Sequence, residues 1–204
     1  MSDNNNLVKK ESLFYALIIG LVAGFLGGVL FSSFKLGPDT VSNPPAATSA
    51  GTPAQLENQT REAINNLETA VTANPDNVEA WTRLGHLYYD TGQVTSAIKA
   101  YERSLELQPG NADVWTDLGV MHRRNKQPGK AIEAFEHAYS IQPNHTTSRI
   151  NKGIVLLYDL NKPEETIAVW EELLTMNPKA LMPNNTPLQD AINEIKEQIK
   201  ANKQ

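Results

Sequence analysis

The sequence predicts an all-α protein, an α-solenoid of stacked helix pairs with an N-terminal transmembrane helix and a C-terminal capping helix. Three observations carry this prediction: a long uncharged stretch near the N-terminus, a pattern of apolar and small residues that recurs along the chain, and an apolar stripe near its end. The chain has 204 residues, 40% of them hydrophobic and 20% charged. This composition is typical of a folded protein with one soluble domain beyond any targeting segment.

The balance of charges and the lack of cysteine exclude several kinds of site. The chain has 18 Lys and Arg against 23 Asp and Glu, for a formal net charge of -5. This charge offers no general attraction to a phosphate backbone, so nucleic acid is not expected as a partner. Without cysteine there are no disulfides, no thiolate zinc ligands and no thiol nucleophiles.

The first element in the chain is a predicted transmembrane anchor over residues 12–34, which carry no charged residue. At 1.5 Å rise per residue this stretch is long enough to cross the roughly 30 Å hydrocarbon core of a bilayer. A cleaved signal peptide is the alternative, but its apolar region would be shorter and followed directly by a small-residue cleavage site. Lys9 and Lys10 precede the stretch, which favours a cytoplasmic N-terminus at residues 1–11. The remainder would then lie outside the cytoplasmic membrane, in the periplasm of a bacterial cell.

Small residues recur every four positions along one side of this predicted span. Gly20, Gly24 and Gly28 belong to this series, which would let a second helix approach closely and pair with it. The alternative is that glycine is simply common in membrane helices. After the span, residues 35–54 are rich in Pro and small residues and are predicted to be a flexible linker.

A repeat with a period of 34 residues follows the linker. Two units share a set of aromatic, small and apolar positions: Trp81, Leu84, Gly85, Ala97, Tyr101 and Pro109 recur as Trp115, Leu118, Gly119, Ala131, Phe135 and Pro143. Within each unit two runs of helical spacing are separated by a turn, so each unit is predicted to be a pair of helices. The first unit covers residues 77–110 and the second residues 111–144.

The shared residues have predictable structural roles. Small side chains at Gly85, Gly119 and their partners in the second helix allow the two helices of a unit to pack closely. The aromatic rings, including Trp81 and Trp115, are expected to be largely buried between helices. Replacing either Trp by Ala is therefore expected to cost about 3–5 kcal/mol.

This set of residues resembles the tetratricopeptide-repeat family, whose pattern is W-x2-L-G-x2-Y, then A-x3-F, then A and P. The resemblance covers about residues 57–178. It implies a scaffold that binds proteins or peptides.

A third, degenerate unit is expected at residues 145–179, where Gly153, Trp170 and Pro178 keep the pattern. Arg149 and Lys152 replace the Trp and Leu of the other units, and one residue is inserted, which we expect in the turn. At the other end, residues 55–76 match only the second helix of a unit and are predicted to cap the array.

The array is expected to end after the third unit, because Leu173 stands where the earlier units have small residues. Residues 184–204 are predicted to form a C-terminal capping helix, with Thr186 as its N-cap and Pro187 as its first residue.

The resemblance also implies that the first helix of each pair lines a concave groove that selects the ligand. The positions implied by the family that we single out as a partner-binding groove are Arg83, His86, Tyr89, Asp113, Asp117, Val120, Arg123, Arg124, Ile150, Asn151, Ile154 and Leu157. This groove is mixed in character and turns apolar towards the third unit.

No enzyme or cofactor site is predicted. The four histidines have no H-E-x-x-H spacing, and no Gly-rich phosphate loop is present. One dense basic patch includes His122, Lys126 and Lys130, where cations either complement a helix dipole or contact a partner.

The predicted function is a membrane-anchored adaptor that mediates protein interaction outside the cytoplasmic membrane. Two alternatives stay open. The layout of anchor, linker, repeats and terminal helix is similar to the tetratricopeptide-repeat subunits of cytochrome c maturation systems, which present apocytochrome to haem-attachment machinery. The other alternative is a self-assembling structural membrane protein.

Overall fold

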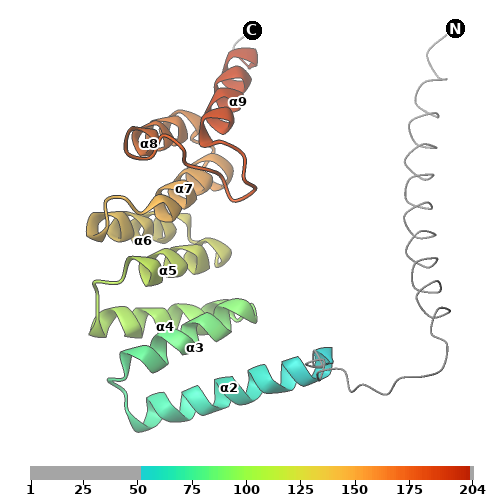
Figure 1. The fold of residues 1–204 in the computed structure, drawn as a ribbon, viewed down its shortest axis with the longest axis vertical. Helices are drawn as coiled ribbons and strands as arrows, with labels where there is room; N and C mark the ends of the chain where they lie inside the picture. Colours follow the sequence, from blue (N-terminus) through green and yellow to red (C-terminus); the bar gives the residue numbers. More distant parts are fainter. Residues whose placement is uncertain (1–51, 203–204) are drawn as a thin grey trace, which may run out of the picture. The chain divides into compact units, whose positions relative to one another are not determined.

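The computed structural model describes residues 52–202, which form a row of helices stacked in chain order (Figure 1). The helices are α2 (Pro53–Ala73), α3 (Val78–Asp90), α4 (Val94–Leu107), α5 (Ala112–Arg124), α6 (Pro128–Ile141), α7 (Thr146–Ile154), the π-helical turn η1 (Val155–Asp159), α8 (Pro163–Met176) and α9 (Leu188–Ala201). Within residues 52–202 the only β pairing is an isolated bridge between Leu181 and Pro187. The predicted all-α solenoid is confirmed for this part of the chain.

The predicted transmembrane span lies outside the described residues, together with Gly20, Gly24 and Gly28 and most of the linker. Among the helices between residues 52 and 202, none has the length and apolar character needed to span a membrane.

Helices pack in pairs, and each pair packs on the next. α3 pairs with α4, α5 with α6, and α7 with α8, while α4 contacts α5 and α6 contacts α7. At the ends of the row, α2 packs on α3 and α9 packs on α8. Each pair is therefore a layer that buries its apolar surface against its neighbours, as in other repeat proteins.

A glycine against an aromatic ring sets the close approach within each pair. A Cβ added at Gly85 would lie 2.5 Å from Cε1 of Tyr101, and one added at Gly119 would lie 2.5 Å from Cε1 of Phe135. In the third pair, a Cβ at Gly153 would meet the indole of Trp170. Real Cβ atoms do not come this close to a ring, so a glycine is required at all three positions.

Trp81 and Trp115 are half-buried and pack against the main apolar cluster of the helix pairs. The indole N–H of each donates a hydrogen bond to a proline carbonyl six residues earlier. The distance from Nε1 is 2.8 Å to the oxygen of Pro75 for Trp81 and 2.8 Å to the oxygen of Pro109 for Trp115. The fully buried rings are Tyr101, Phe135 and Trp170 on the second helices.

Arg149 takes over this role of Trp in the third unit. Its Nε donates to the carbonyl of Pro143 at 3.3 Å, again six residues earlier, and its guanidinium lies 4.3 Å from the ring centroid of Tyr139. Nη1 also pairs with Glu172 at 3.0 Å. A planar donor with a long apolar stem can thus replace an indole, which keeps the degenerate unit folded.

The inserted residue of the third unit lies in its first helix, so the expectation that it lies in the turn is wrong. The turn residue has positive φ in every unit: 71° at Gly92, 58° at Lys126 and 53° at Asn161. The steps between these positions are 34 and 35 residues, so the extra residue comes before Asn161. It is accommodated by η1, where Leu160 N–H bonds to the Val155 carbonyl at 3.1 Å.

The C-terminal helix α9 begins at Leu188 with Pro187 as its N-cap, one residue later than expected. The bridge to Leu181 holds Pro187 in extended backbone, with ψ of 133°, so it cannot be the first helical residue. Leu188 and Ile192 are fully buried and pack with Leu173 of α8 in one apolar cluster. This contact occupies the surface on which a further repeat would stack.

Candidate functional site

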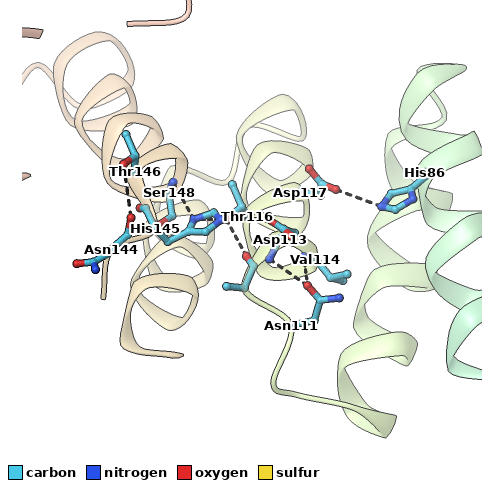
Figure 2. Close-up of polar contacts among 11 residues, drawn as sticks. His86, Asn111, Asp113, Val114, Thr116, Asp117, Asn144, His145, Thr146 and Ser148 are labelled. Carbon is cyan, nitrogen blue, oxygen red and sulfur yellow. Dashed lines mark hydrogen bonds and ion pairs between the residues drawn. The ribbon is translucent and has the colours of Figure 1, made fainter. Parts of the chain in front are cut away.

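The first helices of the pairs form one continuous face, which we call the first-helix face. It consists of α3, α5, α7 and η1, and α5 contacts α7 directly. The predicted groove residues all lie on these helices. Neighbouring helices of the face are joined by polar contacts between the units (Figure 2).

Between α3 and α5, two predicted groove residues of each helix contact each other. His86 Nε2 lies 3.3 Å from Asp117 Oδ2, and the Arg124 guanidinium lies 4.4 Å from the ring centroid of Tyr89. Arg124 also donates to the carbonyl oxygen of Tyr89 at 3.4 Å. Three charged or ionisable side chains of the predicted groove, His86, Asp117 and Arg124, therefore already have partners within the protein.

Between α5 and α7, His145 connects two helices through its two ring nitrogens (Figure 2). Nδ1 accepts from the backbone N–H of Ser148 at 3.3 Å and so caps α7. A ring nitrogen that accepts carries no proton, so in the neutral ring the proton is on Nε2, which donates to Asp113 Oδ1 at 3.0 Å. The predicted groove residue Asp113 is thereby tied to the start of the third unit.

His145 and Asp159 were not among the predicted site residues. The signal for His145 was the repeat itself, because Asn77, Asn111 and His145 are 34 residues apart and all three cap a first helix. Asp159 had no such signal. It lies in the π-helical turn, where it pairs with Arg123 of α5 at 2.5 Å.

Burial affects the acid groups at the centre of the face. It raises the pKa of Asp117, while neighbouring His86 lowers it and Asp113 raises it further. Beneath them, the Tyr101 hydroxyl is buried without a hydrogen-bond partner, and burial raises its pKa far above the ordinary value. An unpaired buried hydroxyl thus lies beneath the polar contacts between α3 and α5.

The third unit forms the apolar end of the face. Ile150 is buried, so it belongs to the core and is not available to a partner, while Ile154 and Leu157 are half-buried. Tyr158 is 70% exposed, although it is a large aromatic residue. Leu157 and Tyr158 also border a hollow of about 290 Å³, whose other walls come from Asn161, Trp170 of α8, Met182 and α9.

Two further predicted groove residues, Val120 and Asn151, are half-buried, and Arg83 is exposed and pairs with Glu79 at 2.8 Å. Within residues 52–202 no group of three His, Asp or Glu residues is placed to hold a metal ion.

The geometry agrees with sequence comparisons to known families. Two family models described as tetratricopeptide repeat match this chain, one over residues 54–119 and the other over residues 112–145. Comparison with curated protein sequences finds no match.

Solved structures of repeat proteins share the fold. MamA is 21% identical with a TM-score of 0.57, over 66% of this chain and 78% of that chain. YrrB, described as a tetratricopeptide-repeat protein with an unusual peptide-binding site, is 19% identical with a TM-score of 0.53, over 61% of this chain and 64% of that chain. The first such domain of Spaghetti, bound to an HSP90 peptide, is 20% identical with a TM-score of 0.52, over 60% of this chain and 95% of that chain.

The repeat period, the pairs of glycine and aromatic ring, and both family models all indicate tetratricopeptide repeats. Residues 54–145 of the chain therefore belong to the tetratricopeptide-repeat family.

Proposed function

We propose that this chain is a non-enzymatic, membrane-anchored adaptor whose first-helix face binds a segment of a partner protein. The observation that carries the proposal is the exposed Tyr158 at the apolar end of that face, beside the hollow bordered by α8 and α9. An aromatic side chain that is 70% exposed next to a concavity is typical of a binding surface. Among the similar structures, the Spaghetti domain binds a peptide of HSP90, which supports a peptide segment as the class of ligand.

The contacts on the face suggest the chemistry of this segment. In the first two units, the side chains of His86, Asp117 and Arg124 already have partners within the protein. Salt bridges at the surface contribute about 0–1 kcal/mol, so exchanging them for contacts with a ligand gains little. The third unit offers half-buried Ile154 and Leu157 with exposed Tyr158. We therefore infer that the segment is amphipathic and that its apolar side lies on the third unit.

Photo-cross-linking in cells tests this proposal and identifies the partner. A benzophenone amino acid in place of Tyr158 is expected to capture the partner, whereas the same probe at Leu56 of α2 is not. Leu56 is a suitable control because it is also an exposed apolar residue, 55% accessible, but lies at the opposite end of the row. Equal capture from both positions would contradict the proposal.

The identified partner then allows a binding measurement. Tyr158→Asp is expected to weaken binding at least about tenfold, because a buried aromatic contact contributes about 1.5–3 kcal/mol. Arg124→Ala is expected to weaken it less than about threefold and to make it less dependent on salt. Circular dichroism checks that both variants are folded. Unchanged affinity for Tyr158→Asp would place binding on another surface.

The anchor and the orientation are part of the same proposal and rest on residues 12–34 with Lys9 and Lys10 before them. A phosphatase that is active only outside the cytoplasm, fused after Gln204, is expected to be active. Activity of a cytoplasm-only reporter at the same position would overturn this orientation. Cytochrome c maturation rests on the layout of the chain alone, so it stays an alternative.

A further inference from the structure

A pair of cavities related by the repeat lies between successive helices. One, of about 420 Å³, is lined by α2, α3 and α4, and the other, of about 630 Å³, by α4, α5 and α6; both are open to solvent. All ten residues that line the first have their counterparts 34 positions later in the second. We call the second the outer cavity; its polar lining includes Glu102, Glu106, His122, Lys130, Glu133 and His137.

One glutamate position shows how the units differ. Glu68 of α2 accepts a hydrogen bond from the Tyr88 hydroxyl at 2.5 Å. The corresponding Glu136 of α6 pairs with Lys152 Nζ at 2.6 Å. The corresponding Glu102 of α4, in the outer cavity, has no ion pair or side-chain hydrogen bond to any residue between 52 and 202. The chain therefore supplies a donor for this carboxylate on α2 and α6 and leaves it open on α4.

His122 adds an acceptor to the same cavity. It is 5% exposed, and its Nδ1 lies 3.0 Å from Oε1 of Gln127. A carbonyl oxygen only accepts, so Nδ1 donates and Nε2 of the neutral ring keeps its lone pair. No residue between 52 and 202 donates to that Nε2, although the ring lines the cavity.

The charges around the outer cavity favour a cation. Glu102 and Glu133 have no ion-pair partner among residues 52–202, whereas the equivalent of Glu133 in the first unit is Lys99. The apolar part of the wall comes from Leu105, Leu118 and the half-buried indole of Trp115, which suits the stem of a long side chain.

We propose that the outer cavity binds an arginine side chain from a basic segment of a partner protein. The guanidinium has five N–H donors and no acceptor, which matches two carboxylates and an imidazole lone pair. The next unit shows related chemistry, since Lys152 stands at the position of Leu118 and pairs with Glu136, the counterpart of Glu102. This site is separate from the first-helix face and does not depend on its function.

Titration of the full-length protein with N-acetyl-arginine methylamide tests the site directly. The readout is the NMR signal of the Trp115 indole N–H, which is assigned with Trp115→Phe. Arginine is expected to shift this signal with a dissociation constant on the order of millimolar, as suits exposed ion pairs. The corresponding citrulline amide, which is neutral, is expected to leave it unshifted. The Trp81 indole reports on the first cavity and is expected to stay unshifted with both.

Two variants distinguish the site from general attraction to a negatively charged protein. Glu102→Gln removes the open carboxylate and is expected to weaken arginine binding about two- to fivefold. His122→Tyr keeps every carboxylate but introduces a phenol placed like that of Tyr88, which is expected to bond Glu102 and abolish the shift. Glu62→Gln removes one exposed charge of α2 outside the cavity and is expected to bind like wild type. The proposal is overturned if arginine and citrulline act alike, if wild type shows no shift, or if both cavity variants bind as wild type does.

Discussion

Replacing Phe135 by Ala is expected to lower the free energy of unfolding of the repeat domain by about 3–5 kcal/mol. Phe135 is fully buried, and it packs in one cluster with Ala131 of its own helix and Val155 of the third unit. Its removal empties a site that two units share. The loss is therefore expected to weaken the contact between units as well as the pair α5 and α6.

Urea unfolding followed by circular dichroism measures this loss, with Trp115→Ala as the comparison. Trp115 is larger but only half-buried, and its main polar contact is the hydrogen bond to Pro109. Trp115→Ala is expected to lower the free energy of unfolding about half as much as Phe135→Ala does, because less buried apolar area returns to water. A larger cost for Trp115→Ala would show that the indole, rather than the ring of the second helix, holds the unit together.

The contrast between these residues shows what the sequence could predict. The 34-residue period identified the helix pairs and placed glycine opposite an aromatic residue, because both helices repeat in register. Trp81 and Trp115 pack against the apolar cluster as their repeat positions suggest, but part of each side chain stays exposed. The hydrogen bond from each indole N–H to a proline carbonyl could not be predicted, because hydropathy does not report such a bond.

The inserted residue illustrates a second limit. Counting residues between matching positions detects an insertion but does not say which backbone segment absorbs it. Helix α7 continues into a π-helical turn because this keeps Trp170 opposite Gly153 and leaves the turn at Asn161 unchanged. The same turn carries Asp159, so the ion pair with Arg123 could not be predicted from spacing.

For the candidate site, the helices were predictable but the pairing of side chains was not. The sequence placed Asp113, Asp117 and Arg124 on one helix, and all three lie on α5. It did not show that His86 and His145 contact two of these carboxylates, since each contact joins helices of different units. The sequence also did not predict that Glu102 lacks a side-chain partner among residues 52–202, because this depends on which neighbouring side chain is long enough to reach its carboxylate.

Gly119→Val is expected to destabilise the domain by about 3 kcal/mol or more, the upper part of the range for overpacked cores. A Cβ at this position would lie 2.5 Å from Cε1 and 2.7 Å from Cδ1 of Phe135. The ring is fully buried and cannot rotate away, so the two helices must separate. Gly129→Val is the matched control, because nothing lies within 4 Å of its added Cβ, and it is expected to change stability by less than about 1 kcal/mol.

A double-mutant cycle tests whether the ring is the cause. Phe135→Leu alone loses buried area, but combined with Gly119→Val it removes part of the clash. The two changes together are therefore expected to cost less than the sum of the single changes, with a coupling of about 1–3 kcal/mol. Additive costs would show that the backbone of α5, rather than contact with Phe135, requires a glycine. Chemical unfolding of wild type, the two single variants and the double variant under one set of conditions gives this coupling. A clash between the added side chain and the ring predicts that the double variant is more stable than the sum of the single costs implies.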